Sequence, residues 1–458
     1  MTLASDEVDE LVRLRRQLHH HPELRFTEHA TAGLLAGMLQ PFGRVRTGLA
    51  GTGLLLEVDG PLPGPAVLLR ADMDAYPVQD VKTEPYASTN AGVCHACGHD
   101  VHMTVAYGVA ARLAADPPAR GSVAVLFQPA EEIPFGEASG AAAVLRDDAL
   151  RGRRFDAVLG LHCWPDLPVG TLGVDRTTAM AAKDAFRVEV LGRTAHAATP
   201  ALGRDAILGL SGMVNLLHAA VARSRNADEL VAFNIGTIAG GASQSQVAGY
   251  AEATGTLRTH DEAVRERLKT VIERLARQQA AALDLGVRFT WANEMPPVRN
   301  AAELVALAHT ELSDLVEVVD LAVPPLTTDD FALLGALGPS LYVKLGVTGE
   351  RGGAPLHSGT FDVDERCLAV GVTALDRLTR AVLDGRLTPS AAPRSTDAPT
   401  GGPSTAGAPA AQRTGSADAP AAQRTGSADT PAAQRTGSAD ANGSAAPGTD
   451  PTVAAVPS

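Results

Sequence analysis

The sequence predicts an α/β protein that contains an inserted α+β unit and ends in a disordered tail. Apolar runs such as residues 123–127 and 156–161 alternate with segments of helical periodicity, as in α/β sheets. Residues 184–295 follow the order strand, helix, strand, strand, helix, strand, which is that of a ferredoxin-like unit. After residue 388 the chain is mostly Pro, Ala, Ser, Thr and Gly, with an eleven-residue repeat, APAAQRTGSAD. We therefore expect a catalytic domain in two parts, 1–183 and 296–388, an insert at 184–295 and a tail at 389–458.

The composition restricts the class of protein. The chain has 458 residues, a formal net charge of −13 and 45% hydrophobic residues, which indicates an acidic globular protein without a nucleic-acid partner. The sequence has no run of about 18 apolar residues and its N-terminus is acidic, so we expect no membrane segment, no signal peptide and a cytoplasmic location. Four cysteines in so long a chain do not form a disulfide scaffold, so we expect thiols that are inert or bound to metal.

The first part of the chain is expected to place carboxylates just after a buried strand. Residues 5–40 have helical periodicity interrupted at Pro22, and short β-like runs follow. One run, at 67–69, precedes Asp72 and Asp74, whose side chains would point to the same side of an extended chain. We interpret these two residues as carboxylates that orient a metal-binding histidine, with a solvated loop as the alternative.

A loop rich in Gly, Cys and His follows and runs into an Ala-rich helix. Gly98 allows a close bend of the backbone, so that Cys97 and His99 can both face inward. Cys94 and Cys97 form a single CxxC motif, and the absence of a second one leaves a closed structural zinc site without enough ligands. We therefore favour Cys97 as a metal ligand and Cys94 as a packed thiol.

Polar side chains also follow two further predicted strands. The strand at 123–127 is followed by Glu131 and Glu132, and the strand at 156–161 ends in His162. Carboxylates and imidazoles at the carboxyl ends of strands are typical of a site in an open α/β sheet. The sequence therefore predicts a site at this edge of the sheet.

The donors available there suit a pair of metal ions. Five donors exceed what a single tetrahedral zinc with an open position needs, and they suit two divalent ions that share a bridging group. The five are Cys97, His99, Glu132, His162 and His357. Such a site activates a water and polarises a carbonyl, and Glu131 would be the general base and acid that passes a proton to a leaving amine. This chemistry is metal-assisted hydrolysis of an amide, although spacing alone leaves ordinary structural histidines as an alternative.

Several motifs, in order from about residue 11 to 387, together resemble the M20 metallopeptidase family. They include LHHHPELRFTEHAT, RADMDAYPVQD, CHACGHDVHMT, FQPAEE, GRTAHAATPALGRDAI, TTDDF and LHSGTFDVDE. The nearest branch is that of aminoacylases, hippurate hydrolases and auxin-conjugate amidohydrolases. The resemblance implies a zinc-peptidase-like catalytic domain, a lid and dimerisation insert, and two Mn²⁺ or Zn²⁺ ions per subunit. It also implies that Cys97 bridges the ions, that His99, Glu132, His162 and His357 are ligands, that Glu131 is the acid/base and that Asp74 steers a ligand.

The same resemblance implies roles for residues of the insert. His196 matches a histidine that reaches into a neighbouring subunit's site and stabilises the oxyanion, which implies a homodimer. Arg258 matches a residue that holds the substrate carboxylate. Ser245 departs from the pattern, because the branch usually has Asn there, in contact with substrate. The loop at 133–141 is longer than usual, and Ser358 is followed by Gly instead of Pro. These departures put the substrate specificity in doubt more than the activity.

We therefore expect an amidohydrolase that acts on N-acyl amino acids, with N-acetyl, N-benzoyl or similar acyl groups. Alternatives in the same class are a deacetylase of an N-acetyl diamino acid and a dipeptidase or carboxypeptidase-like hydrolase. A non-catalytic metal-binding module is a more distant alternative, and the presence of Glu131 and of every ligand speaks against it. A metal-buffering protein is disfavoured because no further Cys/His tract occurs.

Overall fold

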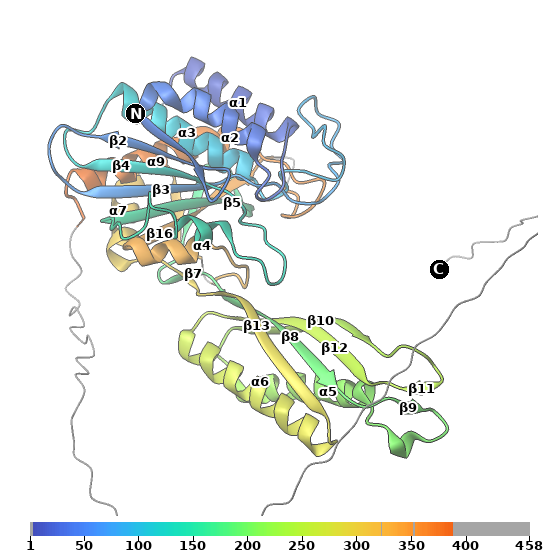
Figure 1. Cartoon of the computed structure of the whole chain (residues 1–458). Coiled ribbons are helices and arrows are strands. Elements are labelled where there is room, and N and C mark those ends of the chain that lie inside the picture. The colour runs from blue at the N-terminus through green and yellow to red at the C-terminus, as the bar shows by residue number, and fades with distance from the viewer. Residues whose placement is uncertain (1–2, 322, 351–352, 388–458) are drawn as a thin grey trace, which may run out of the picture. The chain divides into compact units, whose positions relative to one another are not determined.

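The computed structural model describes residues 3–321, 323–350 and 353–387, which belong to one compact unit. Its main element is an eight-stranded sheet with the order β1-β2-β4-β3-β5-β16-β6-β15 (Figure 1). The strands are β1 Arg44–Leu49, β2 Gly53–Asp59, β3 Ala66–Asp72, β4 Ser122–Gln128, β5 Ala157–Pro168, β6 Thr171–Val174, β15 Glu317–Val319 and β16 Ser340–Thr348. β3 pairs in parallel with β4 and β5, and β5 pairs in parallel with β16. The carboxyl ends of β3 and β4 and the middle of β5 therefore meet at one region of the sheet.

Side chains of the central strands alternate between two cores. Leu54 and Leu56 of β2 pack in one core, and Leu55 packs in the other. The first core includes the helices α1 Ser5–His20, α2 His29–Leu39, α3 His99–Ala115, α7 Ala302–Leu312 and α9 Arg366–Leu383. The second includes the short helices α4 Gly140–Val144 and α8 Phe331–Leu334. A sheet covered on both faces explains why its strands are continuous apolar runs.

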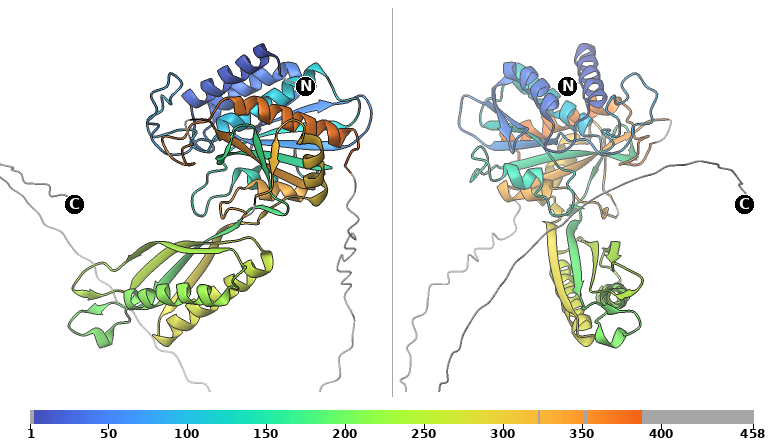
Figure 2. Two further views of the ribbon diagram at one scale, coloured as in Figure 1. Left: turned by 180° about the vertical axis from the view of Figure 1, so that it is seen from behind. Right: turned by 45° about the vertical axis from the view of Figure 1, so that its right-hand side comes forward.

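The inserted unit has its own four-stranded antiparallel sheet with the order β10-β12-β8-β13. Its elements are β8 Ala182–Leu191, α5 Ala206–Ser224, β10 Val231–Gly240, β12 Tyr250–Thr259, α6 Glu262–Ala282 and β13 Gly286–Met295. Both helices cover one face of this sheet and leave the opposite face open (Figure 2). Two short two-stranded sheets are also present. One pairs β9 Ala195–His196 with β11 Gln246–Val247 in the insert, and the other pairs β7 Thr178–Met180 with β14 Val298–Arg299, just before and just after the insert in the chain. The predicted α/β class with a β-α-β-β-α-β insert is confirmed, whereas the domain limits stay a prediction.

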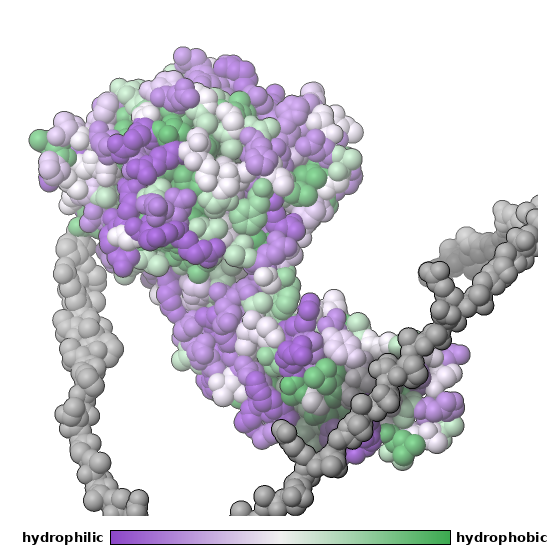
Figure 3. Space-filling model, viewed as in Figure 1, coloured by the Kyte–Doolittle hydropathy of each residue, from purple (hydrophilic) through white to green (hydrophobic). Residues whose placement is uncertain are grey.

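Helix α5 exposes large apolar side chains at its first turn. Among the helices of the described residues, it is the one long and apolar enough to cross a membrane by length and composition. It packs on its sheet through Leu210, Met213 and Leu217, while Ile207 and Leu208 are exposed at 48% and 62%. Apolar side chains are also visible on the surface of the inserted unit in Figure 3.

One local expectation is wrong in detail. β5 does not end before His162 but continues to Pro168, because β16 pairs with it as far as that residue. Residues 327–337 contain the four residues of α8 and a 3₁₀ turn, and Asp330 and Asp329 lie before α8 with their side chains bound to Arg70 and Tyr342. The predicted disorder of residues 389–458 falls outside the described residues.

Candidate metal centre and active site

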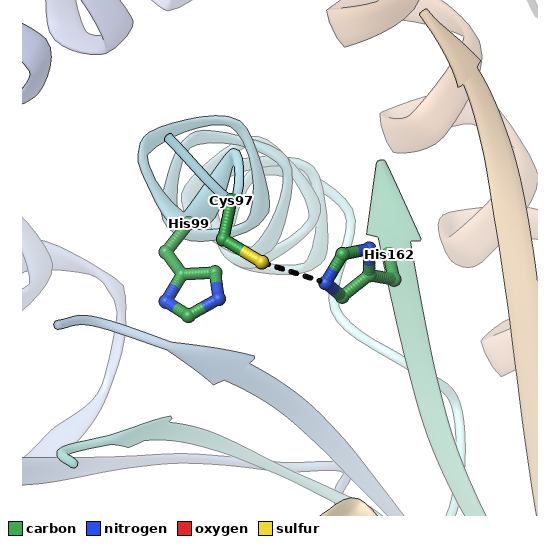
Figure 4. Close-up of side chains that lie close together, drawn as sticks. All are labelled: Cys97, His99 and His162. Carbon is green, nitrogen blue, oxygen red and sulfur yellow. Dashed lines mark hydrogen bonds between the residues drawn. The ribbon is translucent and has the colours of Figure 1, made fainter. Parts of the chain in front are cut away.

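The start of α3 brings two donors toward β5. Gly98 has a φ of +85°, and a Cβ at this position would lie 2.6 Å from Cys163 Sγ, so that only glycine fits. The bend lets Cys97 and His99 face the same space, as Figure 4 shows. Cys97 Sγ lies 3.3 Å from His162 Nε2 on β5. The loop therefore brings a thiol and two imidazoles together.

The five donors form two groups that share Cys97. One group is Cys97, His99 and His162, and the other is Cys97, Glu132 and His357. Within each group the donor atoms lie within 4.8 Å of one another. The structure thus brings all five predicted ligands together, and a shared thiolate between two groups is the arrangement expected of a bridging ligand.

Unpartnered buried atoms fit a pair of cations at this place. His99 Nε2 and Glu132 Oε1 are buried and have no hydrogen-bond partner in the described part of the chain. Glu132 Oε1 lies 2.8 Å from His357 Nε2 but without the alignment of a hydrogen bond. Buried polar atoms without partners are costly, and a bound cation would satisfy both. The residues present therefore fit divalent metal ions.

The tautomers of the two buried histidines are also suitable for metal binding. His99 donates from Nδ1 to the backbone oxygen of Asp74 at 2.7 Å, and His162 donates from Nδ1 to the backbone oxygen of Cys163 at 2.7 Å. Each Nε2 atom is then left with a lone pair that faces the donor groups. Burial, followed by His102, lowers the pKa of His162 to about 3, so its imidazole is neutral.

The site carries an excess of negative charge that a cation would offset. Burial, followed by Glu132 and Glu131, raises the pKa of the Cys97 thiol well above its ordinary value. Burial, followed by Glu132, also raises the pKa of Glu131 well above its ordinary value. Burial opposes protonation of His99, but Asp72 and Asp74 outweigh it and raise its pKa to about 10. Because metal ions compete with protons for these atoms, bound cations would favour the ionised thiolate and the neutral imidazole.

Asp74 holds the segment that carries the two glutamates. Its carboxylate accepts hydrogen bonds from the backbone N–H groups of Glu131 and Glu132, at 3.0 and 2.9 Å. The same carboxylate lies 3.5 Å from His99 Nδ1, which hydrogen-bonds instead to the backbone oxygen of Asp74. Asp74 thus contacts both a donor histidine and the segment of the expected acid/base, and only the first contact was expected from the sequence.

His357 is held in position by its backbone and its ring. Its backbone N–H donates to the oxygen of Ala96 at 2.8 Å, and its φ is +61°, in the left-handed region. The imidazole stacks on Tyr76, with 4.0 Å between the ring centroids. These contacts direct a residue from the far end of the sequence toward Cys97 and Glu132.

Several residues that support the site were not singled out from the sequence. His102 donates from Nδ1 to Asp72 at 2.6 Å and accepts at Nε2 from the Cys163 N–H at 2.9 Å, so neither nitrogen is left for a metal. Arg70, which is 1% exposed, contacts three carboxylates. They are Asp72 at 2.6 Å, Asp330 at 2.8 Å and Asp329 at 3.0 Å. Arg70 and Asp72 lie in the motif RADMD, and Asp329 and Asp330 lie in the motif TTDDF. The sequence alone does not show that these four charged side chains are buried together.

The three predicted substrate contacts lie on the insert and are not gathered with the donors. His196 on β9 is exposed, and its Nδ1 accepts a hydrogen bond from the Ala198 N–H at 3.1 Å. Ser245 precedes β11 and its backbone oxygen accepts from Ala197 N–H at 2.9 Å, which places it beside His196. Arg258 on β12 donates from Nη1 to the backbone oxygen of Leu326 at 2.8 Å. Their predicted roles stay predictions.

The loop at 133–141 contacts the insert. Asn293 on β13 donates from its side chain to the backbone oxygens of Pro134 and Glu137, at 3.3 and 2.8 Å. Its side-chain oxygen accepts from the Gly136 N–H at 2.7 Å. The longer loop is thus bound to the inserted unit directly after the segment that carries Glu131.

A two-part α/β fold with these donors at a sheet edge is suited to metal-assisted hydrolysis. Residues 68–381 match the family model described as Peptidase family M20/M25/M40. The chain belongs to this family, and the protein is a hydrolase.

The relatives include deacetylases of N-acetylated amino acids. N-acetyl-L-cysteine deacetylase of Bacillus subtilis (strain 168) is 34% identical over 378 residues, which are 82% of this chain and 88% of that protein. N-acetyldiaminopimelate deacetylase of the same strain is 31% identical over 377 residues, 80% of this chain and 96% of that protein. The crystal structure of the Bacillus subtilis YXEP protein, a dinuclear metal-binding peptidase from the M20 family, superposes with a TM-score of 0.72 at 30% identity, and covers 83% of this chain and 99% of that one. These similarities support an amidohydrolase of N-acyl amino acids that uses divalent metal.

Proposed function

We propose that the protein hydrolyses the amide bond of N-acyl amino acids with two divalent metal ions, Mn²⁺ or Zn²⁺, and with Glu131 as the general base and acid. The observation that carries this proposal is the pair of donor groups that share Cys97, with Glu131 beside them. Cys97, His99, Glu132, His162 and His357 would hold the ions. When bound, the ions supply Lewis-acid activation of a water and of the substrate carbonyl.

Glu131 moves the protons of the reaction. Its carboxylate accepts a proton from the attacking water as the new C–O bond forms at the amide carbon. It then donates that proton to the amide nitrogen as the C–N bond breaks, which releases a carboxylic acid and a free amine. Asp74 keeps this base in place through its two hydrogen bonds to the backbone of residues 131 and 132.

The acyl group we favour is acetyl. The names of the relatives describe deacetylases of N-acetylcysteine and N-acetyldiaminopimelate, and the second supports deacetylation of an N-acetyl diamino acid as a more specific alternative. In both cases Arg258 would hold the α-carboxylate of the substrate, because a guanidinium is suited to two parallel hydrogen bonds with a carboxylate.

The direct test is release of free amino acid from N-acetyl, N-benzoyl and indole-acetyl amino acids. The full chain is stripped of metal and then resupplied with Mn²⁺ or Zn²⁺. We expect hydrolysis that is lost with the metal and returns with it, fastest on N-acetyl compounds. A protein that binds metal yet hydrolyses none of these amides would contradict the proposal.

Replacement of Cys97 by Ser is expected to lower the metal content. A neutral hydroxyl is a weaker ligand than a thiolate, and the two donor groups would lose the atom that they share. Elemental analysis after dialysis against a limiting metal concentration measures the change. Cys367→Ala is the matched control, since Cys367 is another buried thiol and lies outside both groups. Equal metal content in Cys97→Ser and the unmodified protein would exclude the thiolate as a ligand.

The proposed enzyme is a homodimer formed through the insert. The exposed Ile207 and Leu208 on α5, with the exposed Ile238 on the edge strand β10, form an apolar surface that a second copy could cover. His196 would then act in the partner's site.

A mixed dimer tests this sharing. Glu131→Gln and His196→Ala are each expected to be inactive alone. Co-expression of the two variants is expected to restore ~25% of activity, because half of the dimers are mixed and each mixed C₂ dimer has one intact site. An inactive mixture, with mixed dimers demonstrated by two affinity tags, would mean that His196 serves its own subunit.

A further inference from the structure

The open face of the inserted sheet carries a pair of cations at one end. Lys183 on β8 and Arg258 on β12 are direct partners across the two antiparallel strands, so their side chains leave the same face of the sheet. Ala232 and Met295 complete this row on the outer strands. The α5 and α6 helices cover the opposite face (Figure 2), where Asp184 is bound to Arg265 at 2.7 Å. The row therefore contains two positive charges and no negative one.

Charges farther along the same face are compensated. Arg187 lies 3.9 Å from Glu252, and Arg288 lies 3.0 Å from Glu189. By contrast, no carboxylate oxygen lies within 4.0 Å of Lys183 or Arg258 in the described part of the chain. The single hydrogen bond of Arg258 to the Leu326 backbone leaves the rest of its guanidinium available. Like charges directly opposite each other destabilise a sheet, so this end of the face is suited to an anion.

The uncompensated pair lies where the insert meets the catalytic domain. Arg258 binds the Leu326 backbone at 2.8 Å, and Ala181, two residues before Lys183, donates to the backbone oxygen of Thr327 at 2.8 Å. Lys183 is partly buried and lies within electrostatic range of Glu131 and Glu132. Burial, followed by Arg258, lowers the pKa of its ammonium group, and the two glutamates oppose this change. The two cations thus lie at the end of the insert that adjoins the catalytic domain, and Lys183 is the one within electrostatic range of the expected acid/base.

We propose that Lys183 binds a second anionic group of the substrate, beside the α-carboxylate held by Arg258. The inference rests on the proposed function and specifies its substrate class. That class is an N-acyl amino acid with two carboxylates, of which the second belongs either to an acidic amino-acid side chain or to a dicarboxylic acyl group. An ammonium and a guanidinium side by side can each take one carboxylate through charge-assisted hydrogen bonds.

Two matched substrate pairs test the proposal and separate the two sources of the second carboxylate. N-acetyl-L-glutamate and N-acetyl-L-glutamine differ in charge at the side chain. N-succinyl-L-alanine and N-butyryl-L-alanine differ in charge at the acyl group. We expect the metal-loaded full chain to prefer the charged member of one pair by about tenfold or more in kcat/KM, mainly through KM.

Lys183→Met is expected to abolish that preference and to leave kcat/KM for the neutral member within about twofold. Lys183→Arg should retain most of the preference. Arg288→Met is the matched control, because it removes a cation from the far end of the same face and should leave the preference intact. Since the Lys183 side chain has no ion-pair partner in the described residues, its removal is not expected to lower the melting temperature.

Three results would overturn the proposal. One is the absence of a preference in both pairs, and another is a preference that survives in Lys183→Met. The third is an equal loss on charged and neutral substrates in Lys183→Met, which would assign Lys183 to charge compensation of Glu131 and Glu132. Failure of the proposed function itself is distinct, because no N-acyl amino acid would then be hydrolysed, and this inference would fail with it.

Discussion

Replacing Glu131 with Gln is expected to reduce kcat by roughly 10²–10⁴-fold while metal content and folding are retained. The amide has the size of the carboxylate but cannot accept the proton of the attacking water. Glu131 is not among the five expected ligands, and its removal relieves repulsion with Glu132, which is part of the cause of its raised pKa. Turnover of an N-acetyl amino acid, with elemental analysis of the same sample, measures both effects.

Glu137→Gln is the matched control for this experiment. Glu137 lies in the loop after Glu131, and its side chain is half exposed and 3.7 Å from Arg25. We expect activity to be unchanged, since the backbone oxygen of Glu137, and not its carboxylate, accepts the hydrogen bond from Asn293. If Glu131→Gln retained more than about a tenth of the activity with full metal content, another group would have to be the base.

Replacing Arg70 with Met is expected to lower the free energy of unfolding by about 3–5 kcal/mol, the cost of leaving buried charges without their partner. The three carboxylates of Asp72, Asp329 and Asp330 would lose their shared cation. Gln128 would also lose the hydrogen bond that Arg70 Nε donates at 3.0 Å. Urea unfolding of both proteins measures the difference. Arg288→Met, which breaks an exposed pair, should change stability by at most about 1 kcal/mol.

The loss in free energy of unfolding caused by Arg70→Met is expected to depend on pH. Burial already raises the pKa of Asp330 to about 6, against the effect of Arg70. Without Arg70, the folded-state pKa of Asp330 rises further above its unfolded value. A carboxyl group whose pKa is raised in the folded state lowers the free energy of unfolding at high pH, where it must be ionised. This loss of stability disappears as the pH falls through the folded-state pKa. The deficit should therefore shrink between about pH 8 and about pH 5.5, and a deficit independent of pH would assign it to packing instead.

The order of the main elements was predictable from the sequence, and so were the five residues that the structure gathers around Cys97. Apolar periodicity gave the strands, and motifs in a fixed order pointed to Cys97, Glu132 and His357, which lie far apart in the chain. The length of β5 was not predictable from its own residues, because its pairing with β16, almost 180 residues later, extends it past His162. Pairing across such distances depends on the fold and not on local pattern.

Charged residues were the main omission. Arg70 and Lys183 were not singled out from the sequence, because a residue type alone shows neither burial nor the absence of a partner. Only the strand register reveals that Lys183 lies opposite Arg258, and only the assembled sheet edge brings Arg70 to Asp329 and Asp330. The contact between Asn293 and the loop at 133–141 could not be predicted from the sequence either, since it joins backbone atoms of one segment to a side chain of another.

The left-handed backbone at His357 has a consequence for protein engineering. Ala130, directly before the two glutamates, has a φ of +52° and His357 has a φ of +61°, in a region that disfavours every residue with a Cβ by roughly 1–2 kcal/mol. Glycine would relieve this strain at both positions. A programme that selects thermostable variants by backbone preference alone would therefore choose glycine at 357, and it would raise the melting temperature by deleting one of the five donors.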